Sequence, residues 1–69
     1  MKILIVGSGG REHAILWALK KTARHTLDLY CAPGNAGIAQ VARCISIEAA
    51  NIVALAQFAA REAIDLTFV

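Results

Sequence analysis

Glycine-rich residues 7–13 (GSGGREH) follow directly after an apolar run at residues 3–6 that is rich in β-branched side chains. This order predicts a buried strand, a sharp turn and then a helix. Glycines have no Cβ atom, so the backbone can approach a ligand closely. The helix directs its unpaired N–H groups and the positive end of its dipole to the same place, and Arg11 adds a donor group suited to phosphate or carboxylate. The pattern predicts an anion-binding turn at the end of a central strand.

This turn departs from two familiar phosphate-binding motifs. Dinucleotide-binding turns follow G-x-G-x-x-G, and here Glu12 takes the place of the third glycine. The acidic residue that would bind the adenosine ribose is absent from the end of the next predicted strand, and Asp28 comes too early. No Gly-Lys-Ser/Thr follows, as it would in a Walker loop. A simpler interpretation also stays open, in which the glycines only let a strand meet a helix.

The rest of the chain alternates between predicted strands and helices. We expect strands at residues 2–6, 27–31, 43–47 and 64–69, helices at about residues 10–22 and 51–63, and a short helical turn over residues 36–42. Asn35 could cap that turn. The order predicts an α/β fold with an open parallel sheet of about four strands, in the order 3-2-1-4, with helices on both faces. In such a sheet the glycine turn and the loop at residues 32–37 line one crevice, although this loop could also be a plain connector.

The first predicted helix carries more apolar side chains than one stripe requires. In the first helix the excess, Leu16 or Trp17 in particular, indicates either a second covering surface or a crowded core. In the second helix we expect one apolar face with Phe58 beside it, formed by Ile52, Leu55, Ala56 and Ala59. Ala63 follows where glycine would be easiest, at a cost of up to about 1 kcal/mol if its backbone is left-handed.

The cysteines and histidines give weak functional signals. Cys31 and Cys44 lack the spacing of a metal site, and their apolar surroundings predict buried free thiols rather than a disulfide. His13 lies in the first turn of the predicted helix, where a packing role is favoured over catalysis. His25 is expected in a solvated turn.

Composition limits the class of protein. Of 69 residues, 58% are apolar and 17% are charged, which is more apolar material than so small a domain can bury. We therefore expect association or, because the chain ends in a β-rich run, a piece of a longer protein. The net charge of +2 comes from scattered basic residues, and no apolar run reaches the roughly 18 residues that cross a membrane. We expect a cytoplasmic protein with no nucleic-acid or membrane partner and no signal peptide.

Three segments, taken together, resemble the N-terminal domain of the glycinamide ribonucleotide synthetases, or phosphoribosylamine–glycine ligases. They are VGSGGREHA at residues 6–14 with Trp17, APGNAG at residues 32–37 and IDLT at residues 64–67. The resemblance implies a Rossmann-like, pre-ATP-grasp fold, with residues 1–69 forming a single N-terminal domain of a longer ligase. Ligases of this family use ATP and magnesium (or manganese) to join glycine to 5-phosphoribosylamine in purine biosynthesis, through an acyl phosphate of glycine.

The resemblance also implies a substrate site for phosphoribosylamine or its product, glycinamide ribonucleotide. Its six residues are Gly9, Gly10, Arg11, Glu12, Asn35 and Gly37. The first three would face the phosphate, the glutamate would bind the ribose hydroxyls or orient the amine, and the last two would close the pocket. No catalytic residue or metal ligand is expected in this chain, which alone should be inactive, because the ATP-grasp domains would lie beyond it. Two alternatives are a free-standing nucleotide-binding module and a truncated product that only associates.

Overall fold

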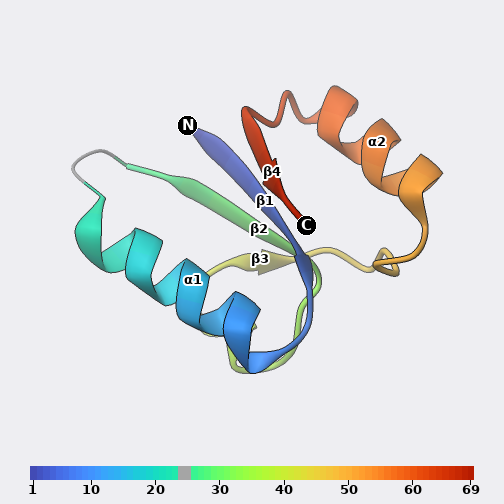
Figure 1. The fold of residues 1–69 in the computed structure, drawn as a ribbon. Coiled ribbons are helices and arrows are strands. Elements are labelled where there is room, and N and C mark those ends of the chain that lie inside the picture. Colours follow the sequence, from blue (N-terminus) through green and yellow to red (C-terminus); the bar gives the residue numbers. More distant parts are fainter. Residues whose placement is uncertain (24–25) are drawn as a thin grey trace.

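A four-stranded parallel sheet separates the two helices of the chain (Figure 1). The computed structural model describes residues 1–23 and 26–69, so the predicted turn at His25 lies outside the described residues. The elements in chain order are β1 (Lys2–Gly7), α1 (Gly10–Thr22), β2 (Asp28–Pro33), the 3-10 turn η1 (Ile38–Gln40), β3 (Arg43–Cys44), α2 (Ile52–Arg61) and β4 (Leu66–Phe68). The strands lie in the order β3-β2-β1-β4, which confirms the predicted α/β topology.

Strand β1 lies inside the sheet because both of its edges are paired. It pairs in parallel with β2 from Lys2 opposite Asp28 to Gly7 opposite Pro33, and with β4 from Ile3 opposite Leu66. Its apolar residues from Ile3 onward are buried without polar alternation, as expected of a strand covered on both faces. The glycine turn therefore begins at the carboxyl end of an inner strand.

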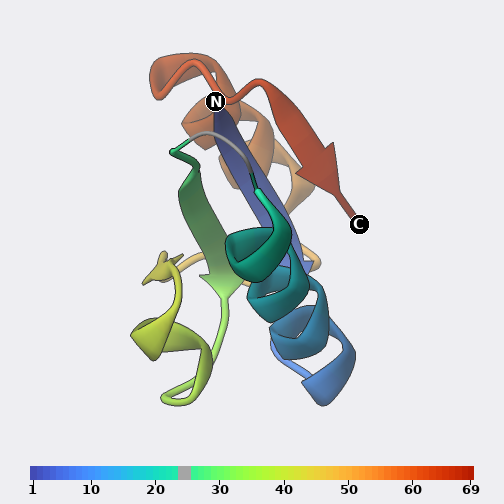
Figure 2. The same ribbon diagram turned by 90° about the vertical axis from the view of Figure 1, so that its left-hand side faces the viewer.

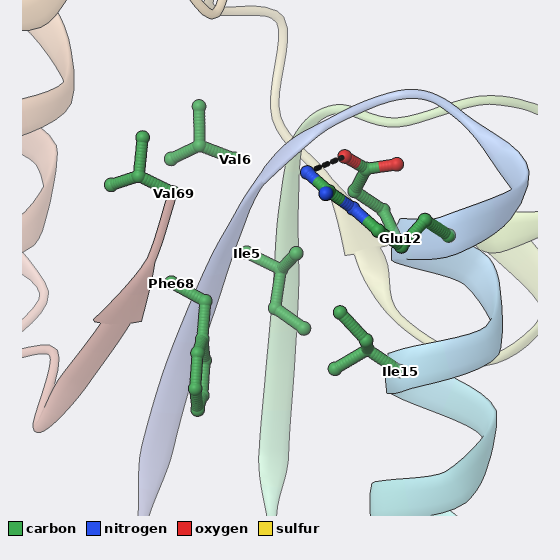
Figure 3. A pocket seen from close by; sticks show the side chains of 7 residues that line it. Ile5, Val6, Glu12, Ile15, Phe68 and Val69 are labelled. Atoms are coloured by element: carbon green, nitrogen blue, oxygen red, sulfur yellow. Dashed lines mark ion pairs between the residues drawn. The ribbon is translucent and has the colours of Figure 1, made fainter.

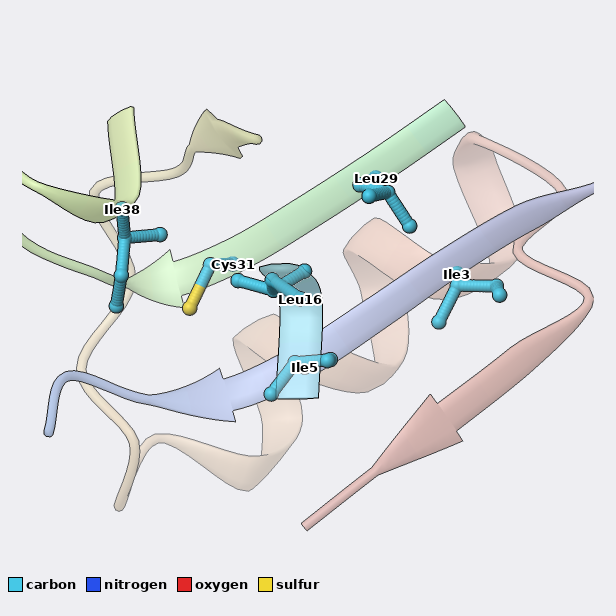
Figure 4. Packing of buried hydrophobic residues seen from close by; sticks show 6 residues of the cluster. All are labelled: Ile3, Ile5, Leu16, Leu29, Cys31 and Ile38. Carbon is cyan, nitrogen blue, oxygen red and sulfur yellow. The ribbon is translucent and has the colours of Figure 1, made fainter. Parts of the chain in front are cut away.

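Successive β1 side chains alternate between two separate cores. On the α1 side, the buried cluster in Figure 4 contains Ile3, Ile5, Leu16, Leu29, Cys31 and Ile38. On the α2 side, the cluster contains Leu4, Val6, Tyr30, Ala32 and Phe58. The Phe58 and Tyr30 rings pack edge to face, with their centroids 5.7 Å apart. Figure 2, turned by 90°, shows α1 in front of the strands and α2 behind them. Helices therefore cover both faces, as predicted.

Strand β3 is shorter than the predicted residues 43–47. The Ile45 N–H still donates to the Cys31 carbonyl at 2.8 Å, but the Ile47 N–H then donates to the Ile45 carbonyl at 2.7 Å. This local hydrogen bond turns the backbone away from β2, and both isoleucines pack against the α2-side cluster. Other elements also differ from their predicted bounds. Strand β2 is shifted to Asp28–Pro33, and three elements are shorter than predicted: α2 (Ile52–Arg61), the helical turn (Ile38–Gln40) and β4 (Leu66–Phe68).

The exposure of the helical side chains decides between the alternatives for α1 and describes the apolar face of α2. Leu16 is fully buried, so the excess apolar residue on α1 is Trp17, which is 53% exposed with the Lys21 ammonium 4.8 Å from its ring centroid. On α2, Phe58 is buried, and the four residues of the predicted apolar face line one groove beside the sheet: Ile52, Leu55, Ala56 and Ala59. Ile52, at the start of the helix, is still 75% exposed. Ala63 has a φ of 53°, so its backbone is left-handed and the local cost considered for this position applies.

Candidate functional site

The glycine turn depends on Gly7 for its conformation. Gly7 has a φ of +143°, and a Cβ atom built on it would lie 2.5 Å from Oε1 of Glu12. Gly9 instead has extended backbone at φ −93° and caps α1, and a Cβ atom on Gly10 would meet nothing within 4 Å. The sequence-based site contained Gly9 and Gly10 but missed Gly7, whose signal in the sequence was its position directly after the apolar run.

The Glu12 side chain folds back over the turn. Its Oε2 accepts a hydrogen bond from the Gly9 N–H at 3.1 Å, which is one half of a capping box. The Arg11 guanidinium lies 3.8 Å from the same carboxylate, and its side chain is 79% exposed against 15% for Glu12. The carboxylate therefore occupies one N–H group of the turn. The next N–H groups, those of Gly10 and Arg11 in the first helical turn, have no acceptor within the helix and are the ones suited to an anion.

Asn35 ties the second loop to the glycine turn. Its Nδ2 donates to the Ser8 carbonyl at 2.7 Å, while its Oδ1 accepts from the Ile38 N–H at 2.9 Å, which confirms the predicted cap of the helical turn. The Gly34 N–H donates to the Gly7 carbonyl at 3.0 Å and adds a backbone link. The two loops therefore form one connected structure at the carboxyl ends of β1 and β2, as the parallel sheet predicts.

Gly37 places the second loop against His13. A Cβ atom on Gly37 would lie 3.1 Å from Cε1 of His13, which is tighter than ordinary packing allows. His13 is partly buried on α1, and this contact agrees with the packing role expected for it. A larger residue at position 37 would push the loop away from the start of α1.

A pocket of about 200 Å³ opens on the other side of the turn, between α1 and the ends of β1 and β4. Figure 3 shows the Glu12 carboxylate beside the turn, with Ile5, Ile15 and Phe68 further along the pocket wall. Arg11 also lines this pocket, which lies where the strand order of the sheet reverses. Of the six predicted site residues, Arg11 and Glu12 line the pocket, whereas Asn35 and Gly37 support the turn from the opposite side through Ser8 and His13.

The two cysteines differ in exposure. Cys31 is fully buried, as expected, but Cys44 is exposed, which corrects the prediction that both thiols are buried. Burial, with smaller contributions from Cys44 and Glu12, raises the pKa of Cys31 to about 11. The Cys31 thiol is therefore neutral at physiological pH, and it donates to the Gly7 carbonyl beneath the glycine turn at 3.2 Å.

Within residues 1–23 and 26–69, no group of three or more His, Cys, Asp or Glu side chains is arranged to hold a metal ion. Over the same residues, neither helix has the length and hydropathy needed to cross a membrane.

An open parallel sheet with a glycine turn where its strand order reverses defines a Rossmann-like α/β domain. In this class of domain, ligands generally bind at the carboxyl ends of the strands. Residues 1–69 match the family model of the phosphoribosylglycinamide synthetase N domain, and the chain belongs to this family.

Several proteins named phosphoribosylamine–glycine ligase match the chain over its whole length. The chain is 51% identical over 69 residues to phosphoribosylamine–glycine ligase of Caldanaerobacter subterraneus subsp. tengcongensis. It is 44% identical over 69 residues to that of Clostridium acetobutylicum and 46% identical over 71 residues to that of Xanthomonas campestris pv. campestris. Each match covers 100% of this chain and 16% of the relative, so the chain spans about a sixth of the length of these ligases.

Proposed function

We propose that residues 1–69 form the N-terminal, substrate-binding domain of a longer phosphoribosylamine–glycine ligase. The ligase would join glycine to 5-phosphoribosylamine in de novo purine biosynthesis, with ATP hydrolysed to ADP and phosphate. The observation that carries this proposal is the match of the whole chain to the family and to relatives that bear this name. The setting would be the cytoplasm, without a membrane or nucleic-acid partner.

The phosphate of phosphoribosylamine, or of the product glycinamide ribonucleotide, would bind at the start of α1. The exposed guanidinium of Arg11 is free to reach it, and the backbone at Gly10 is open to close approach. The dipole of α1 favours a negative charge at this point. Gly9 would contribute through the extended backbone that begins the helix, and Asn35 and Gly37 would act by holding the turn in place.

Glu12 would serve the ribose or the amine rather than the phosphate. Its carboxylate already accepts from the Gly9 N–H, which fixes it beside the turn within 3.8 Å of Arg11. From that position it can accept hydrogen bonds from ribose hydroxyls. A Glu12→Gln variant keeps an oxygen acceptor for the Gly9 N–H but loses the negative charge. We expect phosphate binding to be unchanged or slightly tighter, and discrimination for the ribose to weaken.

ATP and magnesium (or manganese) would be handled by the ATP-grasp domains of the longer ligase. Those domains would be the physical partners of this chain and would supply the chemistry that activates the glycine carboxylate. The residues described here would bind and orient the phosphoribosyl substrate. We expect no ligase activity from the 69-residue chain alone, measured as phosphate release with ATP, magnesium, glycine and phosphoribosylamine.

The proposed substrate site can be tested by titrating the chain with ribose 5-phosphate and following backbone amide shifts by NMR. We expect weak binding, with shifts concentrated at residues 7–13 and 34–37. Arg11→Ala should weaken binding roughly 3- to 10-fold, because a charge-assisted hydrogen bond at so open a site is worth less than its buried counterpart.

Arg61→Ala is the matched control for this titration. Arg61 is also exposed on a helix and also lies 3.8 Å from the next residue's carboxylate, but it is at the end of α2, away from the turn. The Arg61→Ala variant should bind ribose 5-phosphate as tightly as the wild type. Equal weakening by both variants, or shifts centred on Lys20 and Lys21, would show diffuse attraction to positive charge and would overturn the site.

A further inference from the structure

The two cysteines lie opposite each other on adjacent strands. Cys31 of β2 pairs directly with Cys44 of β3. In the preceding pair, the Arg43 guanidinium carbon lies 5.8 Å from the centroid of the Tyr30 ring, so paired side chains on these strands share a face. Adjacent strands are about 4.8 Å apart, within the range of Cα separations that a disulfide can bridge.

Gly34, in the loop after β2, lies against both cysteines. The position that a Cβ atom of Gly34 would take lies 3.4 Å from the Cys44 Cβ and 3.5 Å from the Cys31 Cβ. Both side chains therefore border the same small space beneath Gly34. The Cys44 sulfur lies only 2.5 Å from this position, so a side chain there would displace it. Glycine at position 34 leaves the space that the Cys44 sulfur occupies near the Cys31 Cβ atom.

We propose that Cys44 and Cys31 form a redox pair that hydroperoxides oxidise to an intrachain disulfide between β3 and β2. In the first step the Cys44 thiolate attacks the terminal oxygen of the hydroperoxide, so that an S–O bond forms and the O–O bond breaks. The alkoxide or hydroxide that leaves takes a proton from solvent and becomes an alcohol or water, and Cys44 is left as a sulfenic acid. In the second step the Cys31 sulfur attacks the Cys44 sulfur. The S–S bond forms, the S–O bond breaks, and hydroxide leaves with the Cys31 proton as water.

Exposure determines the order of these steps. Cys44 is open to solvent and meets the oxidant first, whereas Cys31 is buried and acts as the resolving thiol. Because burial raises the pKa of Cys31 to about 11, little of it is thiolate at neutral pH, and the second step is slow there. The rate of disulfide formation from the sulfenic acid should increase as the pH rises towards that value.

Both thiols also support the loops of the candidate site. Cys31 donates to the Gly7 carbonyl at 3.2 Å, and Cys44 donates to the Asn35 carbonyl at 3.6 Å. A disulfide removes both S–H donors and with them the hydrogen bonds to the two loop carbonyls. Oxidation should therefore shift both loops and lower the affinity for ribose 5-phosphate several-fold, a consequence that rests on the proposed function.

The test is intact mass spectrometry of the reduced protein after treatment with hydrogen peroxide. We expect a monomer that has lost two hydrogen atoms and has no thiol left to alkylate. Dithiothreitol should restore both the original mass and the two thiols. Cys44→Ser, at an exposed position that tolerates the change, should leave Cys31 reduced. Cys31→Ala should stop at the sulfenic acid, trapped by dimedone on Cys44. Oxygen addition to Cys44 with Cys31 still free in the wild type, or disulfide-linked dimers alone, would overturn the pair.

A second measurement separates this pair from the substrate site. Ribose 5-phosphate is titrated into the reduced and the oxidised protein. Tighter or equal binding by the oxidised form would overturn the link to the site and leave the disulfide standing. If neither form binds, the proposed function fails, while the mass measurement still decides the redox pair.

Discussion

Of the glycines in the turn, Gly7 is the one that a side chain would disturb most. Its φ of +143° disfavours any L-residue, and an added Cβ would collide with the Glu12 carboxylate that caps the turn. We expect Gly7→Ala to lower the free energy of unfolding by about 1–3 kcal/mol, measured by urea denaturation. Gly10→Ala is the control, because Gly10 begins α1 with open space around it and alanine favours helix by up to about 1 kcal/mol. Equal losses from both substitutions would contradict this assignment.

Ala63 presents the opposite case, a residue with a side chain where glycine fits better. Its φ of 53° lies in the left-handed region just beyond α2. Ala63→Gly should raise the free energy of unfolding by roughly 0.5–1 kcal/mol, because the left-handed strain is relieved and only partly offset by the entropy of glycine. The same change at Ala60, an exposed position within α2, should cost roughly 0.5–1 kcal/mol. A loss of stability at both positions, read from urea midpoints, would rule out strain at Ala63.

Among the elements, the link between the two loops rests on the amide of Asn35. Asn35→Asp keeps an oxygen for the Ile38 N–H but replaces the group that donates to the Ser8 carbonyl with a negatively charged acceptor. We expect a loss of about 0.5–1.5 kcal/mol in the free energy of unfolding, since water can replace a hydrogen bond at this exposed position. Amide shifts at Ser8 and Gly9 should accompany it and would show that the glycine turn has moved.

Asn51→Asp provides the matched control for this change. Asn51 caps α2 by accepting from the Ala54 N–H at 3.1 Å. Aspartate caps as well as asparagine, and its charge suits the positive end of the helix dipole. Stability should therefore stay within about 0.5 kcal/mol of the wild type. If Asn35→Asp proved as harmless as Asn51→Asp, the Asn35–Ser8 hydrogen bond would not hold the loops together.

The elements that the sequence predicted are those determined by local pattern. The apolar run at residues 3–6, the turn after it and the alternation of strands and helices were sufficient to predict the sheet order and both helix layers. The early end of β3 follows from the hydrogen bond between the Ile47 N–H and the Ile45 carbonyl, and Cys44 is exposed on an edge strand. The apolar pattern of these residues reveals neither feature. For the candidate site, residue types indicated an anion at Arg11. The fold of Glu12 over Gly7 became visible only in three dimensions.

At the scale of the whole molecule, apolar side chains gather on the α2 side. A groove of about 330 Å³ runs between α2 and the sheet, and its rim includes Ile52 and Val69. Val53 adds a further apolar side chain on α2, and it is 69% exposed. Exposed apolar surface of this extent favours association.

We expect the 69-residue chain to self-associate through this α2 face, detected as concentration-dependent sedimentation. Replacing both Ile52 and Val53 with Gln should raise the dissociation constant roughly 10-fold or more, since burying each of these side chains is worth about 1–2 kcal/mol at an interface. Because both are exposed, stability should hardly change. Trp17→Gln is the control on the opposite face, where another exposed apolar side chain lies on α1. Association that survives the double substitution but is lost with Trp17→Gln would place the self-association surface on α1. That result would contradict the prediction that the chain associates through its α2 face.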